Sequence, residues 1–416
     1  MNSIKRLFHP YIGLPRSIYS LFFVQIINRF GDFVFPFLSL LLTEKLKLSF
    51  GLTGTIVMMA SLISIPASLL GGKYADQFSR KKTYLFGQSL AAFCILACGF
   101  INIPFLIVTL LILSAFFNGF VRPTISAIMT DNLSPEKRQV GSSLLYLGIN
   151  IGVSVGPMVA GFLFNNFLPL LFIGDAATSF VAVAIVIIFI QDTKPVHGNV
   201  KGINLHEKEE HVNLIQALFK RPRILVFLLI NIAYSFAYRQ TTFTLPMMMN
   251  KVFKENGSGN FGYLMSVNAL TVLLLTFIII GITRRFKTLS NMISAGLFYA
   301  IGFGMIGIIR GNFELYIFST ILWTIGEILS ATNKGVYIAN NSPKNFRARF
   351  SSVDNLTSSI GSALGTYLIG RFLDHHAIEQ VWTLIFVVVL MGTCLMAILR
   401  LYGKRNVVTR EMDRAV

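Results

Sequence analysis

The chain has 416 residues, of which 54% are hydrophobic and 13% are charged. Soluble domains carry charge on about 25% of their residues, so this composition excludes an ordinary water-soluble protein and predicts a chain that lies in lipid. The formal net charge of +18 would suit nucleic acid, but the basic residues gather in alternate loops between apolar runs, which excludes that partner.

Apolar runs of about 20 residues, the length that crosses a bilayer as a helix, occur twelve times. Asn28, Arg29 and Asp32 interrupt the first run, so we do not expect it to be a cleaved signal. The predicted spans are 16–43, 51–75, 82–101, 104–131, 138–164, 168–191, 222–249, 258–283, 287–309, 312–340, 347–373 and 378–401.

A polar stretch divides the spans six and six. It predicts an N-terminal bundle at 1–191, a cytoplasmic linker at 192–221 with a short amphipathic helix near Leu214–Phe219, and a C-terminal bundle at 222–416. Basic loops of multi-pass proteins face the cytoplasm, so we expect both termini there, in the cell (inner) membrane. The basic residues include Lys5, Arg6, Lys73, Arg80, Lys81, Lys82, Lys137, Arg138, Arg284, Arg285, Lys287, Lys344, Arg347, Arg349, Lys404, Arg405 and Arg410.

The two halves repeat each other. An offset of 209 residues places Arg138 on Arg347 and the pair Ser142-Ser143 on Ser351-Ser352, and it places Gly152, Gly156 and Gly161 on Gly361, Gly365 and Gly370. Because each half has six spans, both halves start on the same side and the repeat is parallel. Such halves hold a substrate site between them near mid-membrane.

The loop between the second and third spans has the sequence Gly72-Lys-Tyr-Ala-Asp76-Gln-Phe-Ser-Arg80-Lys-Lys. It resembles the signature loop of the major facilitator superfamily, with Ser79 at a position where that family usually has glycine. The resemblance implies an all-α integral membrane fold of twelve transmembrane helices in two six-helix bundles. A glycine such as Gly72 permits close helix approach or an unusual backbone angle. The planar guanidinium of Arg80 can donate two hydrogen bonds to one carboxylate.

The fifth span contains Gly152, Gly156, Pro157 and Gly161. Glycines four residues apart let helices touch closely, and an internal proline bends a helix. This pattern resembles the antiporter motif that is typical of exporters in the superfamily, and plain helix packing by small residues is compatible with it.

The segments around Asp131 and Glu327 resemble those of proton-coupled multidrug antiporters in the superfamily. That resemblance implies a role for Glu327 in substrate binding and proton coupling. It also implies a cytoplasmic gate formed by Gly72, Asp76, Arg80, Asp131 and Arg138. One departure is Ala115, where the relatives carry an arginine, and Arg122 is the nearest replacement.

Ionisable groups inside lipid cost about 3 kcal/mol each and usually face a partner or a wet cavity. We predict that Glu327 and Asp32 exchange protons, because desolvation penalises a charged carboxylate, and that spans one and seven present polar groups at one depth. Static ion pairing is the alternative, above all for Asp354. The predicted cavity residues are Asp32, Glu327, Arg29, Arg122, Arg239, Gln240, Lys334 and Asp354, with Phe30, Phe33, Tyr234, Phe236 and Tyr238 as aromatic candidates.

The function predicted from these features is a monomeric, proton-coupled exporter of small amphipathic molecules or drugs that works by alternating access. The excess of embedded cations leaves a second hypothesis open, a dedicated exporter or importer of an anionic or zwitterionic metabolite such as a siderophore or organic acid. No phosphate-binding glycine loop occurs, so we expect no cofactor and a proton gradient as the energy source. Cys94, Cys98 and Cys394 complete no metal-ligand set, and only Asp374, His375, His376 and Glu379 would hint at a membrane-embedded enzyme.

Overall fold

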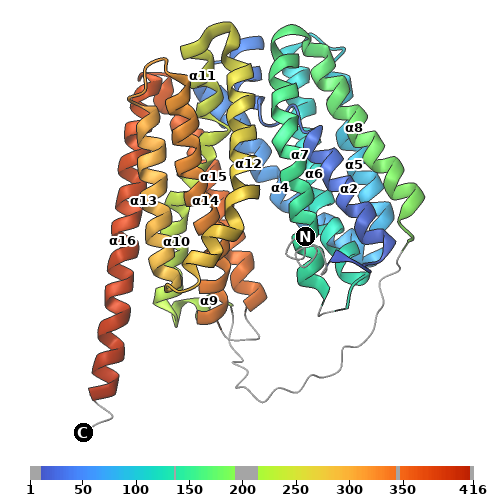
Figure 1. Cartoon of the computed structure of the whole chain (residues 1–416). Helices are drawn as coiled ribbons and strands as arrows, with labels where there is room; N and C mark the ends of the chain where they lie inside the picture. The colour runs from blue at the N-terminus through green and yellow to red at the C-terminus, as the bar shows by residue number, and fades with distance from the viewer. Residues whose placement is uncertain (1–10, 135–136, 193–213, 343–346, 413–416) are drawn as a thin grey trace, which may run out of the picture. The chain divides into compact units, whose positions relative to one another are not determined.

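A computed structural model describes residues 11–134, 137–192, 214–342 and 347–412. Every regular element within these ranges is a helix (Figure 1). Lys5, Arg6, Lys344 and residues 193–213 of the predicted linker lie outside the described residues.

The helices of the first sequence half follow the predicted spans closely. Pro104 begins one helix at its first position, where proline lacks a donor that would be unpaired anyway. The elements are α2 (Arg16–Phe30), α3 (Leu38–Leu40), the π-helix η2 (Leu41–Lys45), α4 (Phe50–Gln77), α5 (Arg80–Cys98), α6 (Pro104–Asp131), α7 (Arg138–Asn166) and α8 (Leu168–Phe189).

The second half repeats this order after the short helix predicted near Leu214. Its elements are α9 (Leu214–Phe219), α10 (Pro222–Tyr238), the 3-10 turn η4 (Arg239–Thr241), α11 (Thr244–Phe253), η5 (Lys254–Asn256), α12 (Gly257–Thr283), α13 (Thr288–Ile306), α14 (Phe313–Asn341), α15 (Arg347–Leu373) and α16 (Ile378–Met412).

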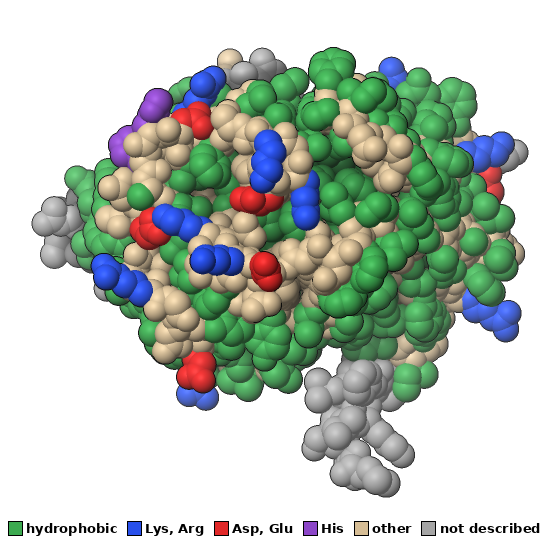
Figure 2. Space-filling view, turned by 90° about the horizontal axis from the view of Figure 1, so that it is seen from above, with side chains coloured by type: hydrophobic (Ala, Val, Ile, Leu, Met, Phe, Trp, Pro, Cys, Tyr) green, Lys and Arg blue, Asp and Glu red, His purple; other side chains and the backbone are tan. Residues whose placement is uncertain are grey.

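Eight described helical stretches are long and apolar enough to cross a membrane, and one of them, Pro222–Thr283, runs from α10 through α12. The other predicted spans correspond to α5, to α15 and to α2 with α3 and η2, which are shorter or more polar. Side chains such as Phe105, Leu69 and Ile188 are at least 70% exposed, as expected of helices whose outer surface faces lipid. On the face seen from above in Figure 2, acidic and basic side chains are interspersed, and hydrophobic side chains surround them.

The first span of each half is not one continuous helix. The chain leaves the α-helical path at Gly31–Phe37 after α2, and again at Arg239–Phe243 after α10. Discontinuous spans expose backbone N–H and C=O groups at membrane depth, which is tolerated only where protein or a cavity satisfies them. These two breaks are therefore the places where a polar site can be built.

The described helices form two compact units. Unit 1 comprises the described residues of Met1–Ser49, Thr55–Asn199 and Leu245–Leu273, and unit 2 comprises those of Phe50–Gly54, Val200–Thr244 and Leu274–Val416. Two segments therefore lie in the unit of the opposite sequence half: the first turn of α4, and the stretch from α11 into α12. The domain boundaries predicted from the sequence stay a prediction.

Helix neighbours within the units follow the repeat. In unit 1, α5 packs on α6 and α8, and α2 packs on α7 and α8; in unit 2, α13 packs on α14 and α16, and α10 packs on α15 and α16 (Figure 1). Each pair is the counterpart of the other under the parallel repeat. A buried apolar cluster that includes Ile18, Leu21, Tyr84, Ile128 and Val186 joins α2, α5, α6 and α8 in unit 1.

Candidate functional site

The break after α2 carries an ion pair. Arg29, in the last turn of α2, places one guanidinium nitrogen 3.1 Å from a carboxylate oxygen of Asp32. The side chains are 43% and 28% exposed, so the pair is reachable from outside the protein core. Asp32 lies two residues beyond the end of α2, so the pair connects the last turn of the helix to the start of the break.

Asp175 holds the same break from α8, and sequence reasoning assigned it no role. Its carboxylate is buried and accepts the backbone N–H groups of Phe33 and Val34, both at 3.1 Å. Both donors lie in the unwound segment. The Phe33 N–H also donates to the Gly31 carbonyl at 2.7 Å, so the carboxylate is a second acceptor for Phe33 and supplies the acceptor that Val34 has lost from the helix. Gly31 packs against Thr178 of α8, where a Cβ atom would clash with the threonine side chain.

Glycines of α7 bring that helix against α2 at the break. A Cβ atom on Gly152 would lie 2.7 Å from the Cβ of Arg29 and 2.5 Å from the carbonyl oxygen of Ile26. A Cβ on Gly156 would lie 3.0 Å from the Arg29 carbonyl oxygen and closer still to that of Phe30. Only glycine permits this approach, so the motif of the fifth span packs directly behind the Arg29–Asp32 pair.

The end of the same motif contacts the first part of α12, which belongs to unit 1. A Cβ on Gly161 would lie 2.5 Å from the carbonyl oxygen of Ser258, whose hydroxyl donates back to the Gly161 carbonyl at 2.9 Å. The Pro157 carbonyl lies against Gly262. In unit 2, Gly361 and Gly365 approach α10 at Ile232 and Phe236 in the corresponding way.

The signature loop forms a charge cluster in unit 1. The Arg80 guanidinium donates to carboxylate oxygens of both Asp76 and Asp131. Ser79 is buried and caps α5, because its hydroxyl accepts the N–H of Lys82 at 3.1 Å and donates to Asp192. Serine in place of the usual family glycine therefore supplies a helix cap, the role for which serine is favoured.

Two residues of the predicted gate lie apart from this cluster. Arg138 donates to the Thr130 carbonyl at 3.4 Å and forms no ion pair with a described acid. No described atom lies within 4 Å of the place where a Cβ on Gly72 would be, and its φ is not positive. The steric reason expected for glycine at position 72 is therefore not found.

Replacement of Arg80 by glutamine is expected to reduce the initial transport rate about tenfold, the effect of about 1.4 kcal/mol on a barrier. The amide cannot hold the Asp76 and Asp131 carboxylates together, and lysine offers one compact charge where arginine offers a fork, so Arg80→Lys should be intermediate. Uptake or efflux in proteoliposomes measures the rate. The control is Lys81→Gln, because Lys81 donates to the Ile187 carbonyl at 2.7 Å and pairs with no acid among the described residues; an equal loss in both variants would contradict the assignment.

Lys334 of unit 2 pairs with a residue of a neighbouring helix. It lies seven residues after Glu327 in α14, a spacing that places both on one helix face, but its ammonium lies 3.0 Å from Asp354 of α15 and 3.0 Å from the Ser358 hydroxyl. Glu327 is half-buried and interacts electrostatically with Tyr299 of α13. Lys334 and Asp354 thus form a static link between α14 and α15, and Glu327 lies apart from it.

The break after α10 holds Arg239 and Gln240. Gln240 is fully buried, donates to the Phe236 carbonyl at 3.0 Å and accepts the Thr244 hydroxyl at 2.7 Å, so it bridges the break with its own neighbours. Tyr234 is buried and bonds to the Met292 carbonyl and the Thr393 hydroxyl, each at 3.2 Å. Among the described residues, Arg239 in unit 2 and Arg122 in unit 1 form no ion pair with an acid.

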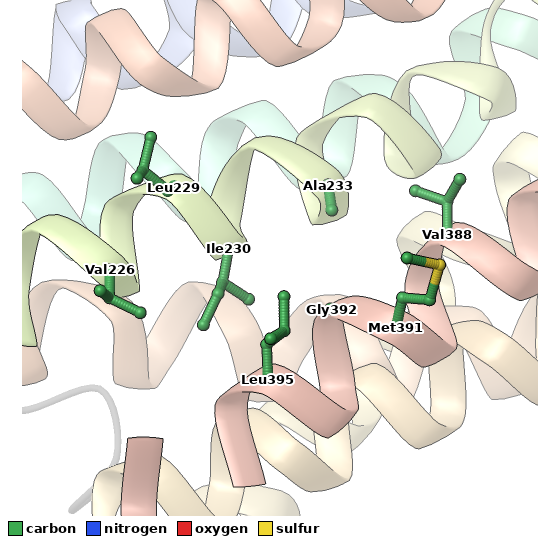
Figure 3. Close-up of a pocket in the computed structure, with 8 residues that line it drawn as sticks. All are labelled: Val226, Leu229, Ile230, Ala233, Val388, Met391, Gly392 and Leu395. Carbon is green, nitrogen blue, oxygen red and sulfur yellow. The ribbon is translucent and has the colours of Figure 1, made fainter. Parts of the chain in front are cut away.

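An apolar pocket of about 350 Å³ lies between α10 and α16 (Figure 3). Its lining has no polar side chain and consists of Val226, Leu229, Ile230, Ala233, Val388, Met391, Gly392 and Leu395. It offers no group that could move a proton or orient a polar solute. No group of three or more His, Cys, Asp or Glu residues among those described is placed to hold a metal ion.

Comparisons with known proteins agree with this architecture. Over 412 residues, the chain is 22% identical to a Na(+), Li(+), K(+)/H(+) antiporter of Planococcus maritimus, a match that covers 90% of this chain and 93% of the antiporter. It is 21% identical over 361 residues to the multidrug resistance protein MdtH of Escherichia coli O1:K1 / APEC, covering 85% and 87% of the two chains. The crystal structure of the peptide transporter POT in complex with sulfate superposes with a TM-score of 0.74 at 17% identity, covering 95% of this chain and 96% of POT.

The family profile of the Major Facilitator Superfamily matches residues 21–366, from α2 into α15. This range includes both broken spans, the signature loop and the glycines of α7. The expectation of an integral membrane transporter, and not an enzyme, is therefore confirmed. The chain belongs to the Major Facilitator Superfamily and is a multi-pass secondary transporter.

Proposed function

We propose that this transporter is a proton-coupled exporter of small amphipathic molecules, in which protons flow in as solute leaves. The observation that carries the proposal is the Arg29–Asp32 ion pair, an accessible carboxylate at a break in a membrane span. Charged groups at such depth are retained mainly for ion or substrate pathways.

Protonation of Asp32 would remove the charge that holds Arg29. Because the Cβ of Arg29 packs against Gly152 of α7, release of the pair would change the contact between α2 and α7. A proton on Asp32 could in this way bias the arrangement of the helices that surround it, which is what coupling requires.

Glu327 is the second coupling candidate. It lies on α14 in unit 2, half-buried and beside Tyr299, and it takes no part in the described Lys334–Asp354 pair. The relatives that bear antiporter and multidrug names support exchange and export as the direction of transport. The basic residues of alternate loops favour cytoplasmic termini, and a single chain is sufficient for the proposed mechanism.

The test is solute transport in proteoliposomes with an imposed pH gradient. Asp32→Asn and Glu327→Gln keep shape but cannot exchange a proton, so each is expected to lower gradient-driven transport to the level of protein-free liposomes. Exchange of labelled for unlabelled solute without a gradient should persist, because binding and helix movement remain. Glu314→Gln is the matched control, since Glu314 lies in the exposed first turn of the same helix; full gradient-driven transport by both coupling variants would refute the proposal.

A further inference from the structure

Aromatic side chains of unit 2 gather beside the break after α10. Tyr238, the last residue of α10, contacts Trp323 of α14 and Tyr299 of α13, with ring centroids 6.2 and 6.3 Å apart. Phe303 stacks on both Tyr299 and Trp323, at 5.5 and 5.8 Å. Arg239 directly follows Tyr238 in the chain and begins the 3-10 turn of the break.

Trp323 has a polar group that its surroundings do not satisfy. The side chain is 1% exposed, and its indole N–H has no acceptor among the described residues. A buried donor without a partner costs about 1–3 kcal/mol, and buried indole N–H groups usually find an acceptor. This donor therefore lacks the acceptor that such a group normally has.

Arg239 has the same deficiency and carries a charge as well. Its Nε–H is buried without an acceptor, although the side chain as a whole is half-buried. The described residues provide no ion pair for the guanidinium, and a cation that is partly removed from water is normally paired. Trp323 and Arg239 thus each contribute a buried donor without an acceptor, and the donor of Arg239 is cationic.

The first half of the protein shows how an arginine at the equivalent break is neutralised. Arg29 is followed three residues later by Asp32, which pairs with it at 3.1 Å. Arg239 is followed three residues later by Thr242, whose hydroxyl donates to the Arg239 carbonyl at 3.4 Å. Arg239 therefore has no carboxylate at the spacing at which Asp32 pairs with Arg29.

We propose that the missing carboxylate is that of the substrate: Arg239 binds an aromatic carboxylic acid, and the Tyr238–Trp323 cluster contacts its ring. The guanidinium fork matches a carboxylate in geometry and charge. The indole N–H of Trp323 gives a second donor to the same ligand. The inference names the solute class of the transporter proposed above and rests on that function, but binding is measurable without transport.

The test uses the two tryptophans of the chain, Trp323 and Trp382. Trp382→Phe leaves Trp323 as the one indole, and 4-nitrobenzoate, which quenches indole fluorescence, is titrated into the purified protein. Its neutral isostere 4-nitrobenzamide has the same ring without the charge. Saturable quenching by the anion, and a dissociation constant at least about tenfold weaker for the amide, is the expected result.

Substitutions at the break after α10 then test whether the positive charge of Arg239 binds the anion. Arg239→Gln should weaken binding of 4-nitrobenzoate about tenfold or more, and Arg239→Lys should weaken it less because the charge remains. Thr242→Asp copies the Arg29–Asp32 arrangement and should also block the anion, whereas the uncharged Thr242→Asn should not. This matched pair at position 242 keeps the test decisive if Arg239→Gln fails to fold.

Equal affinity for acid and amide, or unchanged anion binding in both Arg239→Gln and Thr242→Asp, would overturn the proposal. Additive effects of Arg239→Gln and Trp323→Phe on the dissociation constant, measured by calorimetry, would remove Trp323 from the site, since groups that bind one ligand are expected to couple. Arg239-dependent binding without proton-driven transport would instead refute the coupling and leave this site standing.

Discussion

Replacement of Asp175 by alanine is expected to destabilise the protein by about 1–3 kcal/mol, the cost of an unpaired buried donor. The carboxylate accepts the N–H groups of Phe33 and Val34; alanine would leave the Val34 N–H without this acceptor, while the Phe33 N–H would keep the Gly31 carbonyl at 2.7 Å. Displacement of that segment would also move Asp32, so transport should fall together with stability. Thermal unfolding of the detergent-purified protein, followed by size-exclusion chromatography after heating, measures the effect.

Two variants bracket this prediction. Asp175→Asn keeps one amide oxygen that can accept, so its loss of stability should be smaller than that of the alanine variant. Ser179→Ala, one turn further along α8, removes one neutral hydrogen bond from Gln88, 3.0 Å long in the native protein, and should cost about 1 kcal/mol. If Asp175→Ala were no more damaging than Ser179→Ala, the carboxylate would not be what holds the break.

Replacement of Gly156 by alanine is expected to destabilise the protein by about 1–3 kcal/mol, the range for an added methyl group in a closely packed site. The new Cβ would meet the backbone carbonyl oxygens of Arg29 and Phe30, and backbone cannot rotate away as a side chain can. The contact between α7 and α2 would have to open beside the Arg29–Asp32 pair. Thermal stability and gradient-driven transport should both fall.

The same substitution at Gly72 should have the opposite sign. Gly72 is also helical, and nothing described lies within 4 Å of the added Cβ. Alanine is favoured over glycine in a helix by about 1 kcal/mol, so Gly72→Ala should leave stability unchanged or raise it slightly. Equal destabilisation by the two alanines would show that the close approach of α7 to α2 is not what requires Gly156.

The helical segments could be predicted because they depend on local quantities. The length of each apolar run determines a span, and polar residues, glycine and proline determine its ends, as at Pro104 and the Ser79 cap. The parallel repeat was also visible, since Gly152 and Gly156 recur as Gly361 and Gly365, and both pairs approach the first span of their half.

The breaks in the first spans were not predicted. Gly31–Phe37 and Arg239–Phe243 lie inside runs whose overall apolar length predicted one continuous span each, although polar residues occur at both places. At the first break, the backbone groups are satisfied by Asp175, from a helix remote in sequence. An acceptor supplied over such a distance leaves no periodic signal, although an acid in the middle of an apolar span is itself a sign that a buried polar partner exists.

Partner choice was likewise decided by neighbouring helices. Helical periodicity places Glu327 and Lys334 on one face of α14. The ion pair of Lys334 nevertheless forms with Asp354, because α15 brings that carboxylate to 3.0 Å from the ammonium. Composition, apolar length and the repeat by themselves predicted a membrane protein of twelve spans, and the signature loop indicated a transporter. Only the tertiary structure decided which charges are paired and which, like Arg239, have no ion pair among the described residues, because pairing depends on distances between helices that no local pattern contains.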